Sequence, residues 1–123
     1  MAKRARKIRH IDKKDIIRAE LMKLARAKPL ATMCYSDFGV ITDTRPRGPS
    51  KTVLDLIADE EKAAGLPDIT VLLVHKVKNG QGYPGQIDGK KTSRPPTSQE
   101  KLRARQKLQD VIDRYNRGAA NPF

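Results

Sequence analysis

Positive charge gathers at the two ends of this sequence, and this separates a candidate folded module from its flanks. Residues 1–28 include eleven basic and three acidic side chains, and residues 90–123 include nine basic and three acidic ones. The central residues 29–89 carry six basic and eight acidic side chains. The pattern is typical of a folded module with basic extensions, although solvated tails without a partner give the same pattern.

The total charge points to a polyanionic partner. The 123 residues, enough for one modest domain, carry a formal net charge of +12, beyond the magnitude of about 2 to 8 that solubility alone requires. Nucleic acid is the expected partner because each phosphate that is neutralised by Lys or Arg releases condensed counterions. Acidic membranes and acidic protein surfaces remain alternatives.

The lengths of the apolar runs and the number of cysteines limit which classes of protein this sequence fits. No run approaches the roughly 18 apolar residues of a membrane span, and residues 1–10 lack the apolar stretch of a signal peptide. We therefore expect a cytoplasmic protein that is not inserted in a membrane. Cys34 is the single cysteine, and His10 and His75 are far apart in sequence, so we expect no disulfide framework, no structural metal and no cofactor.

Three helices are predicted by apolar spacing and terminal residues. The first spans Asp12–Ala27, with Ile16 and Ile17 at the start of its apolar stripe, Asp12 as its cap and Pro29 after its end. The second spans Ser50–Ala64, with Ser50 as its cap. The third begins after Thr97, which is followed three residues later by a glutamate in a capping-box pattern.

Shorter elements are predicted between these helices. A very short helix fits a start at Ser36 as cap, and the Pro- and Gly-containing segment Thr42–Pro49 is expected to be a loop. Ile69–Val77 is apolar nearly throughout and predicts a strand that is buried on both sides. The glycines of Asn79–Gly85 indicate a tight turn or hairpin tip, and Lys90–Pro96 is expected to be a linker.

The order of these elements predicts an α+β fold with a winged-helix-like core at residues 12–89. Residues 1–11 form a basic arm, and residues 90–123 form a basic linker and a C-terminal helix. In a winged helix-turn-helix the second helix of the pair enters the major groove, which makes Ser50–Ala64 the candidate recognition helix. Its acidic C-terminal half would be repelled by DNA, so only its first turns, near Lys51, are expected to approach the groove.

Four short stretches resemble a known family. They are Cys34-Tyr35-Ser36-Asp37-Phe38, Ser50-Lys51-Thr52-Val53, Ile69–Val77 and Asn79-Gly80. Together they resemble the DNA-binding domain of the alkylguanine-DNA alkyltransferases and the alkyltransferase-like proteins. The resemblance implies that Tyr35 contacts a DNA phosphate and that Lys51 takes the place of an arginine inserted into the base stack. His75 and Lys76 look like the family's His-Arg pair.

One departure from that family removes its chemistry. The residue before His75 is Val74, where the alkyltransferases have their nucleophilic cysteine, so the resemblance implies no alkyl transfer. Residues 65–70 and 82–85 also resemble small uncharacterised bacterial proteins, and this similarity implies no activity. Cys34 is expected to be a buried small hydrophobic residue, because it sits in a mostly apolar stretch and no His or Asp is locally placed to activate the thiol.

These observations predict a non-enzymatic DNA-binding protein. The basic ends are expected to contact phosphates, and the helix beginning near Ser50 is expected to provide any selectivity. The main alternative is an adaptor, inhibitor or effector that docks on an acidic protein, of the kind that phages or plasmids encode; RNA binding and cysteine-dependent catalysis rank below it. The candidate nucleic-acid-binding residues are Lys3, Arg4, Arg6, Lys7, Arg9, Tyr35, Arg45, Arg47, Ser50, Lys51, His75, Lys76, Lys78, Lys90, Lys91 and Arg94.

Overall fold

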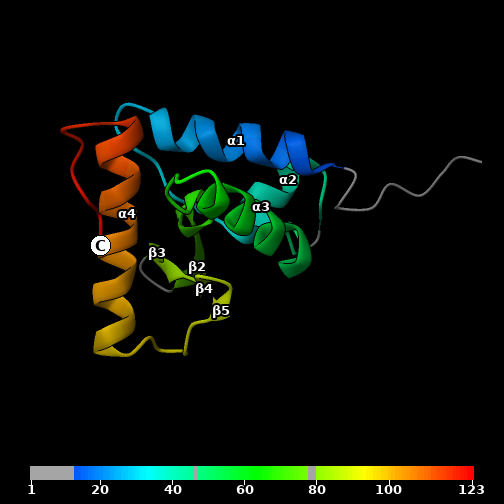
Figure 1. Ribbon diagram of the computed structural model, residues 1–123. Coiled ribbons are helices and arrows are strands. Elements are labelled where there is room, and N and C mark those ends of the chain that lie inside the picture. Colours follow the sequence, from blue (N-terminus) through cyan, green and yellow to red (C-terminus); the bar gives the residue numbers. More distant parts are fainter. Residues whose placement is uncertain (1–12, 46, 78–79) are drawn as a thin grey trace, which may run out of the picture.

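The chain combines helices with short strands, which confirms the predicted α+β class (Figure 1). The computed structural model describes residues 13–45, 47–77 and 80–123. Their elements in chain order are α1 (Lys14–Arg26), β1 (Met33–Cys34), α2 (Tyr35–Thr42), α3 (Lys51–Ala63), the 3₁₀ helix η2 (Ile69–Leu72), β2 (Leu73–Val77), β3 (Gly80–Pro84), β4 (Gln86–Ile87), β5 (Lys90–Lys91) and α4 (Ser98–Tyr115).

Helix α1 buries one face and is joined by its charged face to α3. Its buried residues include Ile17 and Leu21, whereas Ile16, which the sequence placed on the apolar stripe, is 53% exposed. Arg18 is ion-paired with both Glu60 and Glu61 of α3. The predicted cap, Asp12, lies outside the described residues.

The start of α1 is also tied to the end of α2. Lys13 is buried, and its Nζ donates hydrogen bonds to the carbonyl oxygens of Thr42 and Asp43, at 3.3 and 2.7 Å. The same ammonium lies 3.2 Å from the Asp43 carboxylate, which compensates for its burial. The expected short helix itself begins one residue before Ser36, because Cys34, not Ser36, occupies the cap position.

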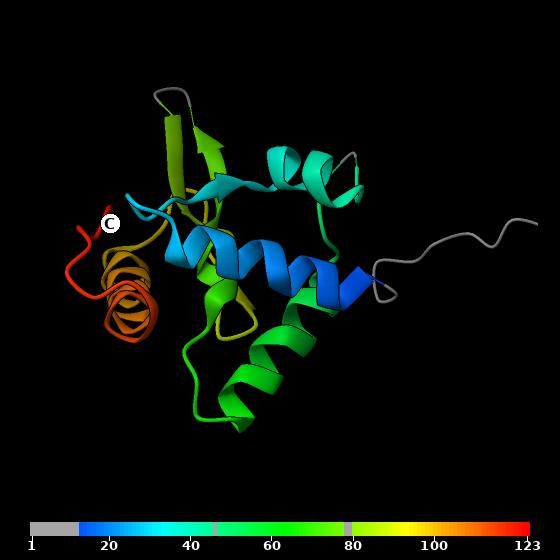
Figure 2. The same ribbon diagram turned by 90° about the horizontal axis from the view of Figure 1, so that it is seen from above.

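The predicted strand at 69–77 is a strand only in its second half. Residues 69–72 form η2, because the Asp68 side chain accepts a hydrogen bond from the Thr70 backbone N–H at 2.9 Å and turns the chain. Strand β2 follows, parallel to β1 and antiparallel to β3 in the order β1-β2-β3. Leu73 and Val74 are fully buried, as predicted for this segment. In Figure 2, β2 and β3 extend together beside α2.

Strands form in the segment expected to be a turn or hairpin tip and in the one expected to be a linker. Residues 80–84 form β3, and its antiparallel pairing with β2 sets Gly80 opposite Val77, which fits the predicted hairpin tip; Asn79 itself lies outside the described residues. At the start of the predicted linker, β5 pairs with β4 across Asp88 and Gly89. Both turn residues have positive φ, 53° and 78°, the geometry of the tight hairpin turns that match strand twist.

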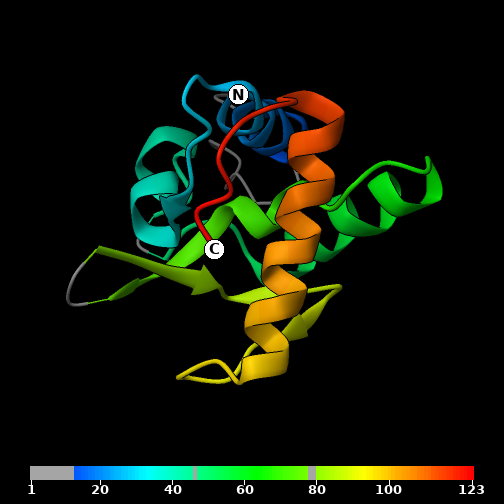
Figure 3. The same cartoon turned by 90° about the vertical axis from the view of Figure 1, so that its left-hand side faces the viewer.

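Helix α4 packs on the same core as the central elements. Its capping box is present, with the Thr97 side chain accepting from the Glu100 backbone N–H and the Glu100 carboxylate accepting from that of Thr97. Leu108 and Val111 are fully buried in one cluster with residues of α1, α3 and η2. The chain after α4 runs back along this helix (Figure 3), where the Asn121 side-chain amide donates to the Arg105 carbonyl at 2.9 Å. Across the described ranges, no helix is both long enough and apolar enough to cross a membrane.

Candidate nucleic-acid interface

A broad open depression brings several predicted site residues together. It has a volume of about 640 Å³ and lies between the start of α2, strand β2 and the segment around β5. Its described lining contains no carboxylate, so the cations there are not neutralised within the cavity. The lining residues are Cys34, Tyr35, Ser36, Arg47, Val74, His75, Lys76, Lys91 and Arg94.

Strand pairing explains why distant residues meet at this depression. The parallel register places Cys34 beside Val74, so the first turn of α2 begins next to His75. The Tyr35 and His75 ring centroids are 5.8 Å apart. The cap of α2 makes no side-chain hydrogen bond, and the unpaired backbone N–H groups of a helix start favour anions. Asp37, in the first turn of α2, carries an opposing negative charge, so the positive potential of the depression comes from its Lys and Arg side chains.

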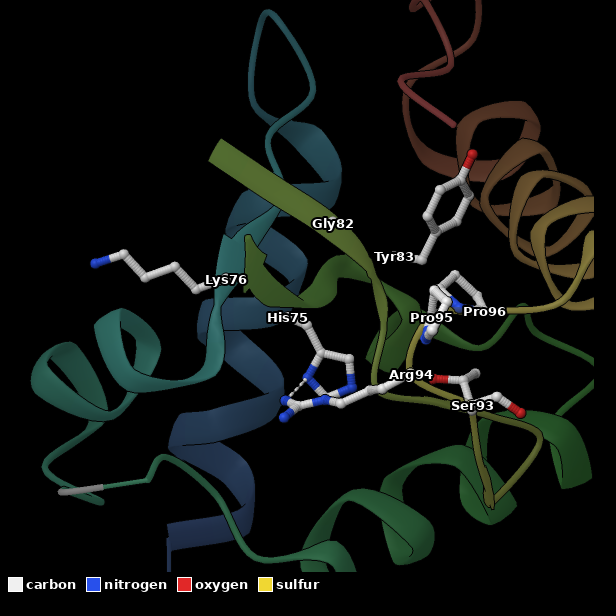
Figure 4. Close-up of a pocket in the computed structure, with 9 residues that line it drawn as sticks. His75, Lys76, Gly82, Tyr83, Ser93, Arg94, Pro95 and Pro96 are labelled. Atoms are coloured by element: carbon white, nitrogen blue, oxygen red, sulfur yellow. Dashed lines mark hydrogen bonds between the residues drawn. The ribbon is translucent and has the colours of Figure 1, made fainter. Parts of the chain in front are cut away.

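His75 and Arg94 are directly joined at this site. An Arg94 guanidinium nitrogen donates to Nδ1 of His75 (Figure 4). Burial, together with the nearby Arg94 charge, holds the pKa of His75 below its usual value of 6.5. The imidazole is thus neutral at pH 7, with Nδ1 as acceptor and the proton on Nε2.

Tyr35 has a structural hydrogen bond in addition to its place in the lining. Its hydroxyl oxygen accepts from the Gly85 backbone N–H at 3.0 Å, which fixes the connection between β3 and β4. Burial raises the pKa of Tyr35 to about 12, so the phenol stays neutral. A phosphate contact, as the family resemblance implies, would use the hydroxyl hydrogen.

The start of α3 is engaged within the protein. Lys51 Nζ lies 2.7 Å from an Asp55 carboxylate oxygen and donates to the Gly89 carbonyl at 2.7 Å. Ser50 caps the helix as predicted, accepting from the Val53 N–H at 3.4 Å. Lys51 therefore joins α3 to the β4–β5 hairpin, and it is not among the residues that line the depression.

The predicted residues divide into three groups. Tyr35, Arg47, His75, Lys76, Lys91 and Arg94 line the depression. Those described but outside its lining are Arg45, which is 3.7 Å from Asp43, and Ser50, Lys51 and Lys90. The predicted residues Lys3, Arg4, Arg6, Lys7, Arg9 and Lys78 lie outside the described residues.

Sequence reasoning missed a second, smaller cavity beside the depression. It has a volume of about 260 Å³, and its wall is mostly apolar (Figure 4). In the sequence, only the two adjacent prolines of the predicted linker, Pro95 and Pro96, pointed to a fixed apolar wall there. It shares His75, Lys76 and Arg94 with the depression, although the Lys76 side chain extends away from it. The other lining residues are Gly82, Tyr83, Thr92, Ser93, Pro95 and Pro96.

Neither a metal site nor a reactive thiol is found at this interface. In the part of the chain that the structure describes, no group of three or more His, Cys, Asp or Glu side chains could hold a metal ion. Cys34 is buried, as predicted, and burial raises the pKa of its thiol above the usual value. The thiol therefore stays protonated at neutral pH, the less reactive form.

Comparison with known proteins identifies no relative of this chain, so its function is inferred from the chemistry of this interface. No protein-family model matches the chain, and no significant match was found among curated proteins or among solved structures.

Proposed function

We propose that this chain is a non-enzymatic protein that binds duplex DNA, with the basic depression as its phosphate-contacting surface. The observation that carries the proposal is the convergence of four cations from three separate segments on a cavity whose described lining contains no carboxylate: Arg47, Lys76, Lys91 and Arg94. Unneutralised cations in a concave surface focus potential and attract a polyanion. Binding would then gain from counterion release at each phosphate contact.

We further propose that the core is a winged helix. The order α1, β1, α2, α3, β2, β3 supports this, because it places a helix pair before a two-stranded hairpin. In this proposal the depression contacts backbone phosphates beside the helix pair. Base contacts from Lys51 would require it to exchange its bonds to Asp55 and Gly89 for bonds to DNA, so we assign less of the affinity to it than to the depression.

The absence of catalysis is also part of the proposal. Val74 is an aliphatic residue at the position that carries the nucleophile in the alkyltransferases, and it is fully buried. Cys34, the other sulfur candidate, has its pKa raised by burial. Both observations favour binding without covalent chemistry.

The test is a salt titration of DNA binding with matched variants. Binding of a short labelled duplex is measured by fluorescence anisotropy for the full chain, for Lys91→Ala and for Lys62→Ala. Both lysines are exposed, but Lys62 lies in the last turn of α3 and does not line the depression. We expect Lys91→Ala to weaken binding and to reduce the slope of log K against log salt by about 0.9, as loss of one phosphate contact predicts.

Two results would contradict this proposal. Equal losses for Lys91→Ala and Lys62→Ala would show that binding depends on total charge, not on the depression. Lack of binding at low salt would remove the nucleic-acid proposal and favour the alternative of a protein that docks on an acidic partner.

A further inference from the structure

Arg94 lies at the boundary between the depression and the smaller cavity, and His75 holds it there. Both residues line both cavities, and the guanidinium donates to Nδ1 of His75. Figure 4 shows the Arg94 side chain extending from the 92–96 segment toward the imidazole on β2. The orientation of one of the site's cations thus depends on a hydrogen bond that only neutral histidine can accept.

The groups that face His75 are cationic or uncharged. Tyr35 faces it from α2, Arg94 from the 92–96 segment, and Arg47 and Lys91 share the depression, while Lys76 is its neighbour on β2. No carboxylate lines either cavity among the described residues, so nothing in the described cavity walls favours the imidazolium. A phosphate in the depression would reverse this balance, because an anion within a few ångströms favours the charged form of histidine.

We propose that His75 and Arg94 form a proton-controlled phosphate clamp, in which protonation of His75 releases the Arg94 guanidinium to the bound phosphate and adds a second positive charge beside it. The proposal rests on the DNA-binding function proposed above and adds a form of regulation to it. The proton comes from solvent and is bound at Nδ1, the atom that previously accepted the hydrogen bond. DNA binding is therefore accompanied by proton uptake, and it tightens as the pH falls.

The direction and size of the effect follow from linkage. In the free protein His75 is neutral at pH 7, since its pKa is lowered, and bound phosphate moves that pKa upward. Each unit by which binding raises the pKa gives a tenfold gain in affinity once the pH is below both values. For an upward shift of about one unit, we expect affinity for duplex DNA to rise by up to about tenfold as the pH falls from about 8 to below the lowered pKa of His75 in the free protein, at constant ionic strength.

Anisotropy titrations over this pH range test the clamp in the full chain. Three proteins are compared: wild type, His75→Gln, whose amide oxygen can still accept from Arg94 but does not titrate, and His10→Gln, which removes the other histidine. Wild type and His10→Gln should both show the rise with falling pH, and His75→Gln should lose most of that rise. A full rise in folded His75→Gln would overturn the proposal.

A measurement without DNA distinguishes failure of the clamp from failure of DNA binding. The His75 imidazole is titrated by NMR in wild type and in Arg94→Gln. Loss of the Arg94 charge and hydrogen bond should raise the His75 pKa. An unchanged titration would refute the clamp even if DNA binds. A raised pKa in a protein that binds no DNA at any pH would instead refute the DNA-binding function and, with it, regulation of that function by His75.

Discussion

Substitution of Gly48 by alanine is expected to destabilise the fold around the interface. Its φ is +87°, and a β-carbon placed on it would lie 2.4 Å from the Tyr35 carbonyl oxygen. That oxygen belongs to the first residue of α2 and cannot move without shifting the helix start. Gly65 offers a matched control, because its φ is also positive, +72°, but its β-carbon would meet no atom within 4 Å.

Both substitutions are expected to lower the free energy of unfolding through backbone strain, and only one of them through steric overlap as well. An L-residue in the left-handed region costs about 1 kcal/mol, and both Gly48→Ala and Gly65→Ala incur it. Steric overlap in a well-packed region adds about 1 to 3 kcal/mol, and only Gly48→Ala incurs this. We therefore expect Gly65→Ala to lower the free energy of unfolding by about 1 kcal/mol and Gly48→Ala to lower it by about 3 kcal/mol.

Urea unfolding followed by far-ultraviolet circular dichroism measures both values. The comparison requires equal m-values, so that the shift in midpoint reports stability. Equal destabilisation by the two alanines would refute the argument that Gly48 is needed for its contact with Tyr35 as well as for its backbone angle. A Gly48→Ala protein that retains wild-type stability would refute both parts.

Two further substitutions test buried hydrogen bonds. Tyr35→Phe leaves the Gly85 N–H without the hydroxyl that accepts from it, and the free energy of unfolding should fall by about 1 to 3 kcal/mol in urea unfolding; unchanged stability would contradict the structural role of this bond. Asn116→Ala removes the donor that bonds the Ala25 and Ala27 carbonyls, at 3.0 and 2.6 Å, and should cost a similar amount, about 1 to 3 kcal/mol. Asn121→Ala is its control and should cost less, about 0.5 kcal/mol, because the bonds from its amide to Arg105 and Gln109 are exposed and only the one it accepts from the Phe123 N–H is partly buried.

The elements with local signals were predictable from the sequence. Ser50 and Thr97 mark their helices through capping bonds between residues only three apart in the chain. The conversion of Ile69–Leu72 into a 3₁₀ helix was missed because apolar composition does not reveal the Asp68 side chain bonded to the backbone. A strand and a short helix that are both fully buried look alike in such a run.

The candidate site was predictable in composition but not in geometry. Lys91 and Arg94 were named from charge, and His75 and Lys76 from the family resemblance. Their convergence depends on the parallel pairing of β1 with β2 and on the β4–β5 hairpin. Lys51 shows the opposite case. Its position at a helix start predicts contact with DNA, which stays a prediction, whereas its bond to the carbonyl of Gly89, 38 residues away, could not be predicted from the sequence.

The ion pairs between α1 and α3 have a consequence for how a partner would approach. Glu60 and Glu61 were expected to repel DNA, but Lys14 and Arg18 lie against them, so this edge presents little net field. The depression, without a described carboxylate in its wall, keeps its field. Charge is thus balanced at these ion pairs and retained in the depression, which would favour approach of a polyanion to the depression. Under the proposed function, these ion pairs between α1 and the C-terminal half of α3 would increase the fraction of encounters in which the depression meets DNA first, without touching DNA themselves.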